Sequence, residues 1–495
     1  MSEGDKPNLA PNGQSQTVGI RSPSSPGIAA GDFPNAQGHN SKRRIKMSKD
    51  DILPMRSVGA VPAYADIASY KMVFGGLHVW EGDGWKEESM SWKTSCYVAA
   101  NLTGPLEITY SGPDAQDFLS RLSINNVYKW PIGTSKHLVM PDKNGLIANH
   151  GLAIRDSEDS FRQLASLPWA VYQLESAKMD VQVSVRDIFI LQVAGPTSLQ
   201  VLEKLLGRSL RDLKFLAIQR IQIPGLDAEL DLEVSRIGMV GTLAYEIRGP
   251  LEAGPEVYDA VYQAGKEFGI KRLGWRTYAV NHTEGGFPQL NGTFCASVLA
   301  DSEFMGSPLG ALMHASLTGS VDPADLRARL RTPQEVNWAW MTKFDHDFIG
   351  RDAIEAEAEN PRRKTVILRW NREDILDIFA SHFEPGEEYK YLEFPVAPQM
   401  MSGGHADLVT KDGKEVGVAS AAIYSYYYRE MLSQCAIDID LAEIGNEVIL
   451  HWGDYGHRIK QVRATVERFP YLDLPRNKDY DLSSVPSAVT ATVSI

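Results

Sequence analysis

Residues of the types that bind metals or activate nucleophiles are few in this chain, and their spacing decides what they can do. Asp345, His346 and Asp347 combine metal-ligand residue types, but neighbouring acids where a loop enters a helix usually act as caps, so we predict no metal site. The three cysteines are far apart and fit neither a zinc site nor a disulfide framework. The sequence also lacks a Gly-x-Gly-x-x-Gly turn after a strand, a P-loop and a His-Glu-x-x-His pair. Dinucleotide, phosphate-loop and zinc-protease chemistry are therefore not indicated.

The composition narrows the class of protein. The chain has 495 residues, is 43% hydrophobic and carries a formal net charge of −13, so it can bury large cores, more naturally in two or three domains than in one. The negative charge argues against a nucleic-acid partner, which needs a positive face. No apolar run approaches the roughly 20 residues that cross a bilayer, and no signal peptide opens the sequence. We expect a cytoplasmic protein with no membrane partner; the sequence assigns no oligomeric state.

A strand followed by Gly-Pro and a helix recurs three times. Strands are predicted over 106–110, 188–193 and 245–248, and proline suits the first turn of the helix that follows each. Spacings of three and four residues give each helix one apolar face. The three faces are Ala115, Phe118, Leu119 and Leu122; Leu199, Leu202, Leu205 and Leu206; and Val257, Val261, Ala264 and Phe268. This pattern predicts an α+β fold of antiparallel sheets covered by helices on one side.

The two ends of the chain differ from this middle part. Residues 1–50 are rich in Gly, Pro, Ser, Asn and Gln and predict a disordered tail. Beyond about residue 360, short strands over 364–370, 415–423 and 448–452 and a turn at 411–414 predict a β-rich domain, barrel or sandwich, with little helix. We assign this domain to residues 361–480, and a second tail to 481–495.

The run over 343–356, Lys-Phe-Asp-His-Asp-Phe-Ile-Gly-Arg-Asp-Ala-Ile-Glu-Ala, is the most informative stretch. As local structure it predicts a loop entering a helix, with Asp347 as the N-terminal cap, Phe348 and Ile349 in a core and Gly350 at a turn. The same run resembles a signature of the glycine-cleavage T-protein superfamily, a group of folate-dependent one-carbon transferases.

Other segments carry the same resemblance over most of residues 60–475. Gln192-Val193-Ala194-Gly195-Pro196 is similar to the family's Gln-x-x-Gly-Pro strand end, and Leu273-Gly274-x-Arg276 with Thr283-Glu284-Gly285-Gly286 is similar to its Gly-x-Arg…Leu-Glu-x-Gly segment. The branch that the chain resembles is the tetrahydrofolate-dependent aryl O-demethylases. The resemblance implies a T-protein-like cloverleaf of two interleaved α+β folate-binding domains over 51–360, plus a C-terminal domain like a β-barrel.

The resemblance also implies a binding site for the reduced pterin ring, whose edge of N–H donors pairs with a buried carboxylate. Glu246 matches the family's pterin-binding glutamate, and Gln192 matches a glutamine that helps hold the ring. Phe287 stands where the demethylase branch has a tryptophan near the folate. The alternatives are a solvated strand glutamate, a glutamine that satisfies turn backbone and a core phenylalanine.

Tyr278 coincides with the tyrosine that is essential in the demethylase branch. Transfer of the ether methyl to folate N5 expels a phenolate, and a tyrosine with an ordinary pKa near 10 suits proton donation to it. The alternative is a buried tyrosine bonded to backbone. Two bound reactants held in line would supply much of the remaining catalysis.

The chain departs from the family in the turn over 145–150. Ordinary T-proteins have an aspartate there, poised over the folate; here Asn149 or His150 takes its place. Asparagine cannot balance the charge of an aminomethyl-ammonium substrate, which weakens the case for glycine cleavage. His150 is a candidate substrate contact, with a surface or turn histidine as the alternative.

The substrate carboxylate site of the vanillate-type enzymes is also altered. Ser166 and Gly104 stand where those enzymes hold the carboxylate with an arginine and a histidine. An unpaired carboxylate in a buried pocket costs several kcal/mol. The substrate therefore presents its acid differently or is another methoxylated aromatic; the herbicide dicamba is one candidate. Tyr64, in an N-terminal aromatic cluster, is a candidate wall of the aryl pocket or plain core.

We therefore predict a methyltransferase that moves a methyl group from a methoxylated, methoxybenzoate-like aromatic to tetrahydrofolate. Its partners would be this small aromatic and tetrahydrofolate. One alternative is a related transferase with an aminomethyl or sulfonium donor. Another is a non-enzymatic folate-binding protein of iron–sulfur assembly, although the full C-terminal domain and the lack of a reactive cysteine motif count against it.

Overall fold

A computed structural model describes residues 61, 64–73, 76–102, 106–164, 168–238, 241–313, 315–396 and 404–489. The tail predicted over 1–50 lies outside the described residues. No helix in the described ranges is both long and apolar enough to pass through a bilayer. Cys96, Cys295 and Cys435 are buried and unpaired.

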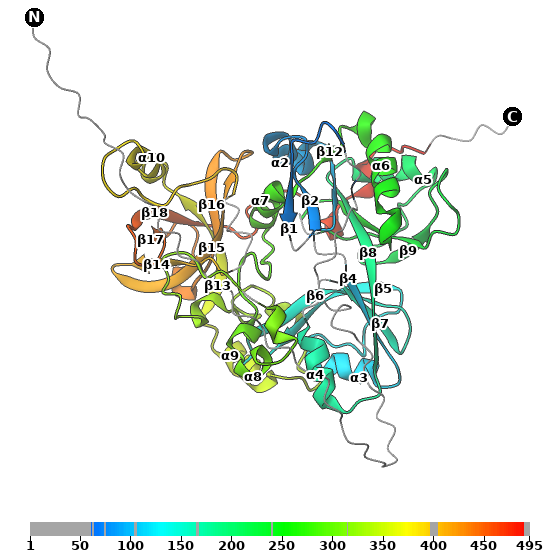
Figure 1. Cartoon of the computed structure of the whole chain (residues 1–495), viewed down its shortest axis with the longest axis horizontal. Coiled ribbons are helices and arrows are strands. Elements are labelled where there is room, and N and C mark those ends of the chain that lie inside the picture. Colours follow the sequence, from blue (N-terminus) through cyan, green and yellow to red (C-terminus); the bar gives the residue numbers. More distant parts are fainter. Residues whose placement is uncertain are drawn as a thin grey trace, which may run out of the picture. The chain divides into compact units, whose positions relative to one another are not determined.

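A ten-stranded sheet forms the first part of the chain (Figure 1). Its main path runs β5-β6-β7-β4-β8-β11-β10-β9, and β3 joins β8 and β12. All pairs are antiparallel except the parallel pair of β12 and β3. The strands are β3 (Tyr97–Ala100), β4 (Leu106–Ser111), β5 (Thr134–Pro141), β6 (Ile147–Arg155), β7 (Ser160–Leu164), β8 (Gln182–Ala194), β9 (Ile218–Ile221), β10 (Leu232–Ser235), β11 (Ala244–Pro250) and β12 (Lys271–Arg272). A separate hairpin joins β1 (Ser69–Val73) and β2 (Gly76–Glu81).

Strand β8 is much longer than the strand predicted over 188–193 and links the two halves of the sheet. Its first half pairs with β4 and its second half with β11 and β3. The first half, which alternates exposed and partly buried residues, carries a weaker apolar signal than the fully buried second half. Sequence patterning therefore found only the buried part.

The three predicted helices are confirmed as α3 (Ala115–Leu122), α5 (Ser198–Leu206) and α6 (Gly254–Gly265). Their apolar faces pack onto the sheet in two cores, one around α3 and one between α5 and α6. The helices begin two to four residues after the predicted prolines. The first two Gly-Pro turns require glycine. Gly112 and Gly195 have positive φ, 128° and 130°, and a Cβ at these positions would lie 2.6 and 2.4 Å from a backbone oxygen.

The remaining helices connect these parts. They are α2 (Trp85–Thr94), α4 (Trp169–Ala177), α7 (Trp275–Gly285), α8 (Ser302–Met305), α9 (Arg351–Glu359) and α10 (Arg372–Ser381). Helix α7 contacts α2, the β1–β2 hairpin through β2, and two strands of the C-terminal domain, β15 (Lys414–Ser425) and β16 (Glu430–Asp438). It is therefore the element on which the sheet, the hairpin and the C-terminal domain meet.

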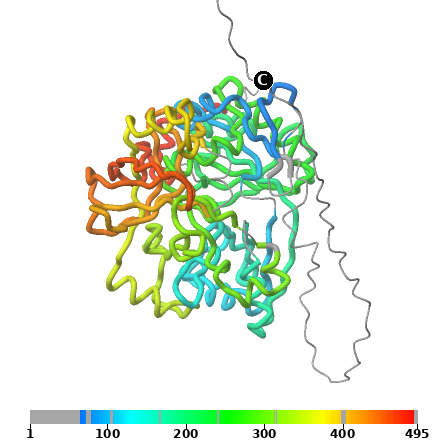
Figure 2. The backbone as a smooth tube through the Cα atoms, turned by 60° about the vertical axis from the view of Figure 1, so that its left-hand side comes forward, coloured from blue at the N-terminus to red at the C-terminus, as the bar shows by residue number. Residues whose placement is uncertain are grey.

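The C-terminal strands close into a barrel in the order β13-β16-β15-β14-β17-β18, which decides between the predicted barrel and sandwich. The other four strands are β13 (Arg363–Trp370), β14 (Asp407–Lys411), β17 (Glu447–Trp452) and β18 (Lys460–Glu467). Figure 2 shows their yellow-to-red backbone gathered together. The predicted turn is a two-residue hairpin loop in which Asp412 and Gly413 both have positive φ.

Helix α10, within the predicted β-rich domain, was not predicted. Asn371 caps it by accepting hydrogen bonds from the backbone N–H groups of Glu373 and Asp374. Asp374 also pairs with Arg463 on β18, at 2.9 Å. The cap was visible in the sequence, but the tertiary pairing that holds the helix was not.

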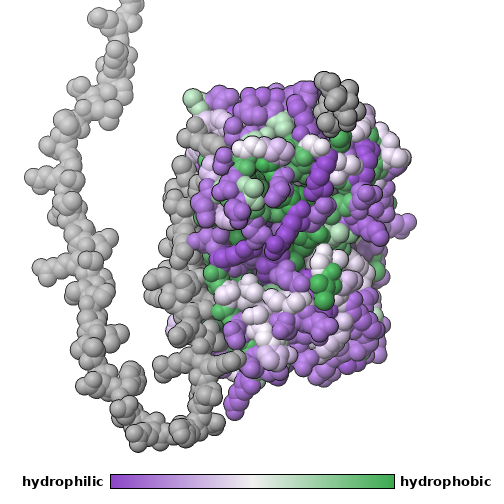
Figure 3. All heavy atoms as spheres, turned by 90° about the vertical axis from the view of Figure 1, so that its right-hand side faces the viewer, coloured by the Kyte–Doolittle hydropathy of each residue, from purple (hydrophilic) through white to green (hydrophobic). Residues whose placement is uncertain are grey.

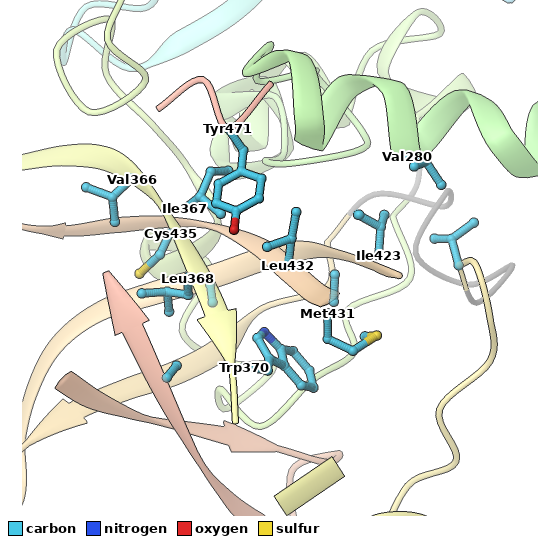
Figure 4. Packing of buried hydrophobic residues seen from close by; sticks show 14 of the residues in the cluster. Val280, Val366, Ile367, Leu368, Trp370, Ile423, Met431, Leu432, Cys435 and Tyr471 are labelled. Carbon is cyan, nitrogen blue, oxygen red and sulfur yellow. The ribbon is translucent and has the colours of Figure 1, made fainter. Parts of the chain in front are cut away.

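The barrel core continues into α7. Figure 4 shows Val280 of α7 facing Ile423 and Leu432 of the barrel, with Trp370 and Met431 beyond them. All five side chains belong to one buried cluster. A helix whose apolar side is shared with a closed barrel has little freedom to rotate, so the polar side chains that it carries are held in place.

The run over 343–356 corrects one prediction. Asp347 is exposed and does not cap α9; the N-cap is Gly350, whose φ is 80°. A Cβ there would lie 2.1 Å from the backbone oxygen of Asp142, so the position requires glycine for the approach as well as for the turn. Phe348 is buried as predicted, and Ile349 packs against the core around α3.

The surface has the mixed character expected of a charged chain. Figure 3 shows a face on which hydrophilic residues predominate, with hydrophobic residues gathered toward its middle. The exposed large hydrophobic residues in the described ranges are spread over many elements rather than concentrated on one, which is normal for a globular protein.

Candidate active site

Two of the predicted pterin-binding residues lie directly opposite each other on neighbouring strands. Gln192 of β8 and Glu246 of β11 are register partners, and both are largely buried. The hydroxyl of Tyr97, on β3, donates a hydrogen bond to the Gln192 side-chain oxygen. Asn281 of α7 donates to the Tyr97 oxygen at 3.0 Å. Three strands and one helix thus bring four polar side chains together, which we call the acceptor strip: Tyr97, Gln192, Glu246 and Asn281.

An arginine supports the Glu246 carboxylate. Arg248, two residues along the same strand and therefore on the same face, donates to Glu246 Oε2 at 3.0 Å and to Ser235 Oγ at 2.8 Å. Both members of the ion pair are more than nine-tenths buried. A buried carboxylate needs a charged or hydrogen-bonding partner, and the Arg248 guanidinium provides one for Glu246.

The acceptor strip has the polarity that a reduced pterin requires. Asn281 Oδ1 is buried and has no hydrogen-bond partner among the described residues. A buried carbonyl oxygen without a donor is costly, and a ligand that presents N–H groups would satisfy it. Glu246 and Asn281 together offer a carboxylate and an amide oxygen, which fits the donor edge of a pterin.

Tyr278 lies between the acceptor strip and the loop that follows α7. It is fully buried, and burial raises the pKa of its phenol well above the usual value, with the nearby Tyr97 and Glu246 adding to the effect. A hydrogen bond from Gln289 acts in the opposite direction. The hydroxyl is therefore protonated, is hydrogen-bonded to Gln289 and is influenced by the charge of Glu246. The predicted match with the acidity of a free phenol does not hold in this state.

His282, one helical turn after Tyr278, was not predicted. Its ring lies 4.2 Å from the Tyr278 ring, measured between centroids, and its Nδ1 is 3.1 Å from the Tyr278 backbone oxygen. A carbonyl oxygen only accepts, so Nδ1 carries the proton and Nε2 is an acceptor. Nε2 is buried without a hydrogen-bond partner among the described residues. Burial lowers the pKa of His282 to about 4, so the ring is neutral at physiological pH.

His150 fixes the loop that carries Gln289. Its Nε2 accepts a hydrogen bond from the Leu290 backbone N–H at 3.0 Å, so the proton is on Nδ1, which lies 2.9 Å from His137 Nε2. Burial lowers the pKa of His137 to about 4 and that of His150 well below its usual value. Both rings are therefore neutral, and both nitrogens of His150 bond to the protein. The alternative of a surface or turn histidine is wrong, because His150 is a buried strand residue.

Phe287 packs in an aromatic cluster beside this histidine pair. Its ring centroid lies 5.5 Å from that of His137 and 5.7 Å from those of His282 and Trp338. The cluster connects the Tyr278–His282 turn of α7 with strands β5 and β6.

Strand alternation separates the two candidates for the missing aspartate. His150 pairs with Val139 and Asn149 with Met140, on opposite faces of the sheet. The Asn149 side chain is fully buried and points to Met140 Sδ at 3.8 Å. His150, not Asn149, therefore lies on the side of Phe287.

Of the predicted substrate residues that the structure describes, Tyr64 and His150 are not brought together. The Tyr64 hydroxyl donates a hydrogen bond to Asp259 at 2.6 Å, and its ring packs against Tyr258 and Tyr262 of α6. None of these partners belongs to α7. Ser166 and Gly104 lie outside the described residues.

A small cavity opens beside Tyr278, between α7, the loop after it and the barrel. Seven residues line it: Ala279, His282, Gln289, Gly292, Thr293, Val396 and Ala421. Val396 and Ala421 come from the C-terminal domain, so the cavity is completed by residues that lie more than 100 positions beyond α7 in the sequence.

An ion pair buried at the end of α7 holds the helix against its neighbours. Lys93 Nζ of α2 lies 2.5 Å from Glu284 Oε2, and Ser425 Oγ of β15 donates to Glu284 Oε1 at 2.6 Å. Neither charged side chain is accessible to solvent to a meaningful extent. This glutamate belongs to the predicted Leu-Glu-x-Gly segment, and its contacts are structural.

Sequence reasoning missed Tyr97, Asn281, His282 and Arg248. A signal existed for two of them, because Asn281 and His282 follow Tyr278 by three and four residues and so share its side of the helix. Tyr97 and Arg248 become visible only through strand register.

Comparison with known proteins shows which family the chain resembles. The GCVT N-terminal domain family matches residues 78–294. The chain is 33% identical over 421 residues to a sesamin methylene transferase of a Sinomonas species and 29% identical over 422 residues to a syringate O-demethylase of a Sphingobium species. These alignments cover 81% and 80% of this chain, and 92% and 90% of the relatives. The fold is that of the glycine cleavage system aminomethyltransferase T of Bartonella henselae, with a TM-score of 0.60 and 14% identity over 82% of this chain and 95% of that one.

Proposed function

This chain belongs to the glycine-cleavage T-protein (GCVT) family, and within it we propose a tetrahydrofolate-dependent O-demethylase that acts on a methoxylated aromatic compound. The products would be 5-methyl-tetrahydrofolate and a phenol. The proposal combines the O-demethylase activity of the syringate relative with the residues around α7.

Tetrahydrofolate is the one-carbon acceptor, and the acceptor strip is where its pterin would be held. Glu246 would take the charge-assisted hydrogen bonds from the ring edge, with Gln192 and Asn281 beside it. Bound tetrahydrofolate supplies the nucleophilic N5 to which the methyl carbon is transferred. The rest of the chemistry concerns the leaving oxygen.

Tyr278 would donate to that oxygen. As the ether C–O bond breaks and the C–N5 bond forms, the departing phenolate needs a proton, and N5 loses one in exchange. The Tyr278 hydroxyl is protonated, lies near Glu246 and is oriented by Gln289. A positioned proton donor of this kind contributes about 10²- to 10⁴-fold to a rate.

One observation supports the proposal: the buried Tyr278 is bonded to Gln289 and its ring contacts that of His282, and the charge of Glu246 in the acceptor strip acts on its hydroxyl. The raised pKa keeps Tyr278 protonated at neutral pH, so it is a hydrogen-bond donor rather than a base, while burial also makes it a weaker acid than a free phenol.

The proposal is tested with tetrahydrofolate and a panel of aromatics whose methoxy groups carry deuterium. Mass spectrometry should find trideuteromethyl on tetrahydrofolate and an equal amount of the demethylated phenol. Release of the label as formaldehyde, or no transfer from any aromatic while tetrahydrofolate binds, would refute it.

A second candidate is transfer of a methylene group from a methylenedioxy aromatic. It is favoured by the 33% identity to the sesamin methylene transferase, which exceeds the 29% to the syringate enzyme. The assay distinguishes the two once methylenedioxy aromatics are added to the panel. A methylene donor would leave a one-carbon bridge between two nitrogens of the folate, whereas a methoxy donor would leave a methyl group, and the two products differ in mass.

A further inference from the structure

We propose that Glu88 of helix α2 is a positioning residue for Tyr278: its buried carboxylate holds the start of α7, and through it the Tyr278 hydroxyl, in place for proton donation. This inference rests on the proposed function, since that function assigns the role of Tyr278. Glu88 acts through the backbone of α7 and is assigned no contact with either reactant.

The Glu88 carboxylate is fully buried and accepts hydrogen bonds from backbone N–H groups of two separate segments. Oε1 accepts from Gly82 and Asp83, at 2.7 and 3.1 Å, just after strand β2. Oε2 accepts from Gly274, the N-cap residue of α7, at 3.1 Å. One side chain of α2 therefore joins the end of the β1–β2 hairpin to the start of α7, and Figure 1 shows these three elements beside one another.

Gly274 carries this contact directly to Tyr278. Its N–H donates to Glu88, and its carbonyl oxygen accepts from the Tyr278 N–H at 3.2 Å, in the first turn of α7. Glycine has no side chain with which to cap a helix, and no side-chain cap bond is present at this position. A single residue thus separates the Glu88 carboxylate from the Tyr278 backbone.

The backbone around this contact is packed too closely to absorb a shift. A Cβ at Gly82 would lie 2.1 Å from the Arg272 backbone oxygen, and one at Gly274 would lie 2.3 Å from that of Trp80. Both positions require glycine for the approach. Because backbone lies against backbone here, a displacement of Glu88 moves the start of α7 rather than a flexible side chain.

Charged side chains approach Glu88 from β2, the turn after it, β12 and α7, and they are paired with one another. The pairs are Arg272 with Asp83 and Asp66, and Arg276 with Glu81. In the described part of the chain, no cation pairs with Glu88 itself. The other ionisable groups on the elements around it are Tyr258 of α6, which burial keeps neutral, and Lys93, farther along α2 and paired with Glu284.

Without a cation, burial raises the pKa of the Glu88 carboxyl to about 7, and the charge of Glu81 adds to the effect. Hydrogen bonds from Thr277, Gly274 and Gly82 act in the opposite direction. Both protonation states are therefore populated at neutral pH. Oε1 already takes two donors, so the proton goes to Oε2, whose bond to Gly274 weakens because a hydroxyl oxygen accepts less strongly than a carboxylate oxygen. The ionised form holds α7 more firmly.

Activity and stability should therefore depend on pH in opposite senses. The folded-state pKa of Glu88 lies above the ordinary value of 4.5, so the folded protein binds this proton more tightly than the unfolded chain does. The contribution of Glu88 to stability is present below pH 4.5 and is lost as the pH rises through about 7. The ionised form that positions Tyr278 is thus the form that folding disfavours, which a merely structural glutamate would not show.

The test measures single-turnover methyl transfer at saturating tetrahydrofolate and methoxyarene as a function of pH. Between about pH 5.5 and 8.5 the wild-type rate should rise about tenfold, with its midpoint near 7, as α7 is drawn into place. Glu88→Gln keeps the shape, but its amide nitrogen donates and cannot accept from the backbone. Its rate should stay at the low level throughout, with tetrahydrofolate affinity unchanged within about twofold.

A matched control is Glu203→Gln, which changes a fully buried glutamate of α5 that pairs with Arg211. This variant should keep the wild-type rate and the wild-type pH profile. In denaturant titrations, rising pH should lower the stability of the wild type relative to Glu88→Gln.

Hydrogen exchange of the peptide that spans the first turn of α7 needs no turnover. Protection of the Thr277 and Tyr278 amides should fall in Glu88→Gln and, in the wild type alone, as the pH drops below 7. The wild-type measurements need no variant to fold.

Equal protection in the three proteins, or a wild-type pH profile that Glu88→Gln reproduces, would overturn the inference and leave the O-demethylase proposal standing. If protection of α7 depends on Glu88 but no methyl group is transferred, the positioning of the helix holds and the O-demethylase proposal fails.

Discussion

The surroundings of helix α7 differ in charge between its sheet side and its barrel side. On the side of the sheet, Asn281 joins Gln192 and Glu246, and an Arg248–Glu246 ion pair brings charge to the surface of the strip. On the side of the barrel, His282 and Gln289 line a cavity without charged groups among the described residues. Tyr278 stands between them. Under the proposed function, the pterin would bind on the sheet side of α7 and the aromatic on the barrel side.

This division follows from helix geometry. Asn281 and His282 follow Tyr278 by three and four residues, which is one helical turn. They therefore lie on the same side of the helix as Tyr278, one to each side of it. The opposite side of α7, represented by Val280, is packed into the barrel core and fixes the rotation of the helix. The following predictions test whether the two sides act separately, in order of decreasing effect.

The largest effect is expected from breaking the ion pair that holds α7. Lys93→Met leaves Glu284 buried and uncompensated, which should lower the free energy of unfolding by about 3–5 kcal/mol in denaturant titration. Lys204→Met, which breaks an exposed pair with Glu267, serves as the control and should cost about 1 kcal/mol or less. Similar values for the two variants would show that the buried pair does not hold the helix.

Glu246→Gln removes the charge from the sheet side only. Loss of a charge-assisted hydrogen bond should weaken tetrahydrofolate binding by about 1.5–3 kcal/mol, or roughly 10- to 150-fold, measured by calorimetry. Binding of 2-methoxyphenol should not change beyond about twofold. If both ligands weaken together, the two sides are not separate sites.

Protonation of His282 should disturb the cavity side. Burial lowers its pKa to about 4, whereas the unfolded chain has the ordinary value of 6.5, so the unfolded state binds more protons between these values. The contribution of His282 to stability is therefore present above pH 6.5 and is lost as the pH falls through 4. Between pH 7 and 5 this loss is about 2 kcal/mol.

Denaturation of His282→Gln at pH 7, 6 and 5 measures this contribution. The variant should lose about 2 kcal/mol less than the wild type over that range. Parallel curves for the two proteins would mean that His282 is not held neutral by burial.

Asn281→Leu should have the smallest effect. It removes one neutral acceptor from the sheet side, so tetrahydrofolate binding should weaken by about 1 kcal/mol, or roughly fivefold. The rate of methyl transfer at saturating tetrahydrofolate should stay as in the wild type. A large loss of that rate would place Asn281 beside the reacting groups instead.

The strands and helices with regular apolar spacing could be predicted from the sequence, and the irregular ones could not. The face of α3 was predicted residue by residue because its 3–4 spacing is unbroken. Helix α9 is capped by Gly350 and not by Asp347 because the backbone at Gly350 closely approaches that of Asp142. A local sequence pattern cannot predict this approach. Helix α10 is held by an ion pair to a strand 89 residues away along the chain.

The candidate site also has a part that could be predicted from the sequence and a part that could not. Family resemblance gave Tyr278, Gln192 and Glu246, and these three are gathered around one helix and one strand pair. The choice between Asn149 and His150 needed strand alternation and a bulge in the β5–β6 pairing. The proton positions on His150 and His282 needed their hydrogen-bond partners, which come from distant segments.

The most direct test of the central claim is the single-turnover rate of methyl transfer by Tyr278→Phe across methoxyarenes whose leaving phenols differ in acidity. If the hydroxyl donates its proton to the ether oxygen, the variant should bind tetrahydrofolate normally and lose about a hundredfold or more with 2-methoxyphenol. The loss should shrink steadily as the leaving phenol becomes more acidic. A loss that is the same across the series, or an unchanged rate, would contradict proton donation by Tyr278.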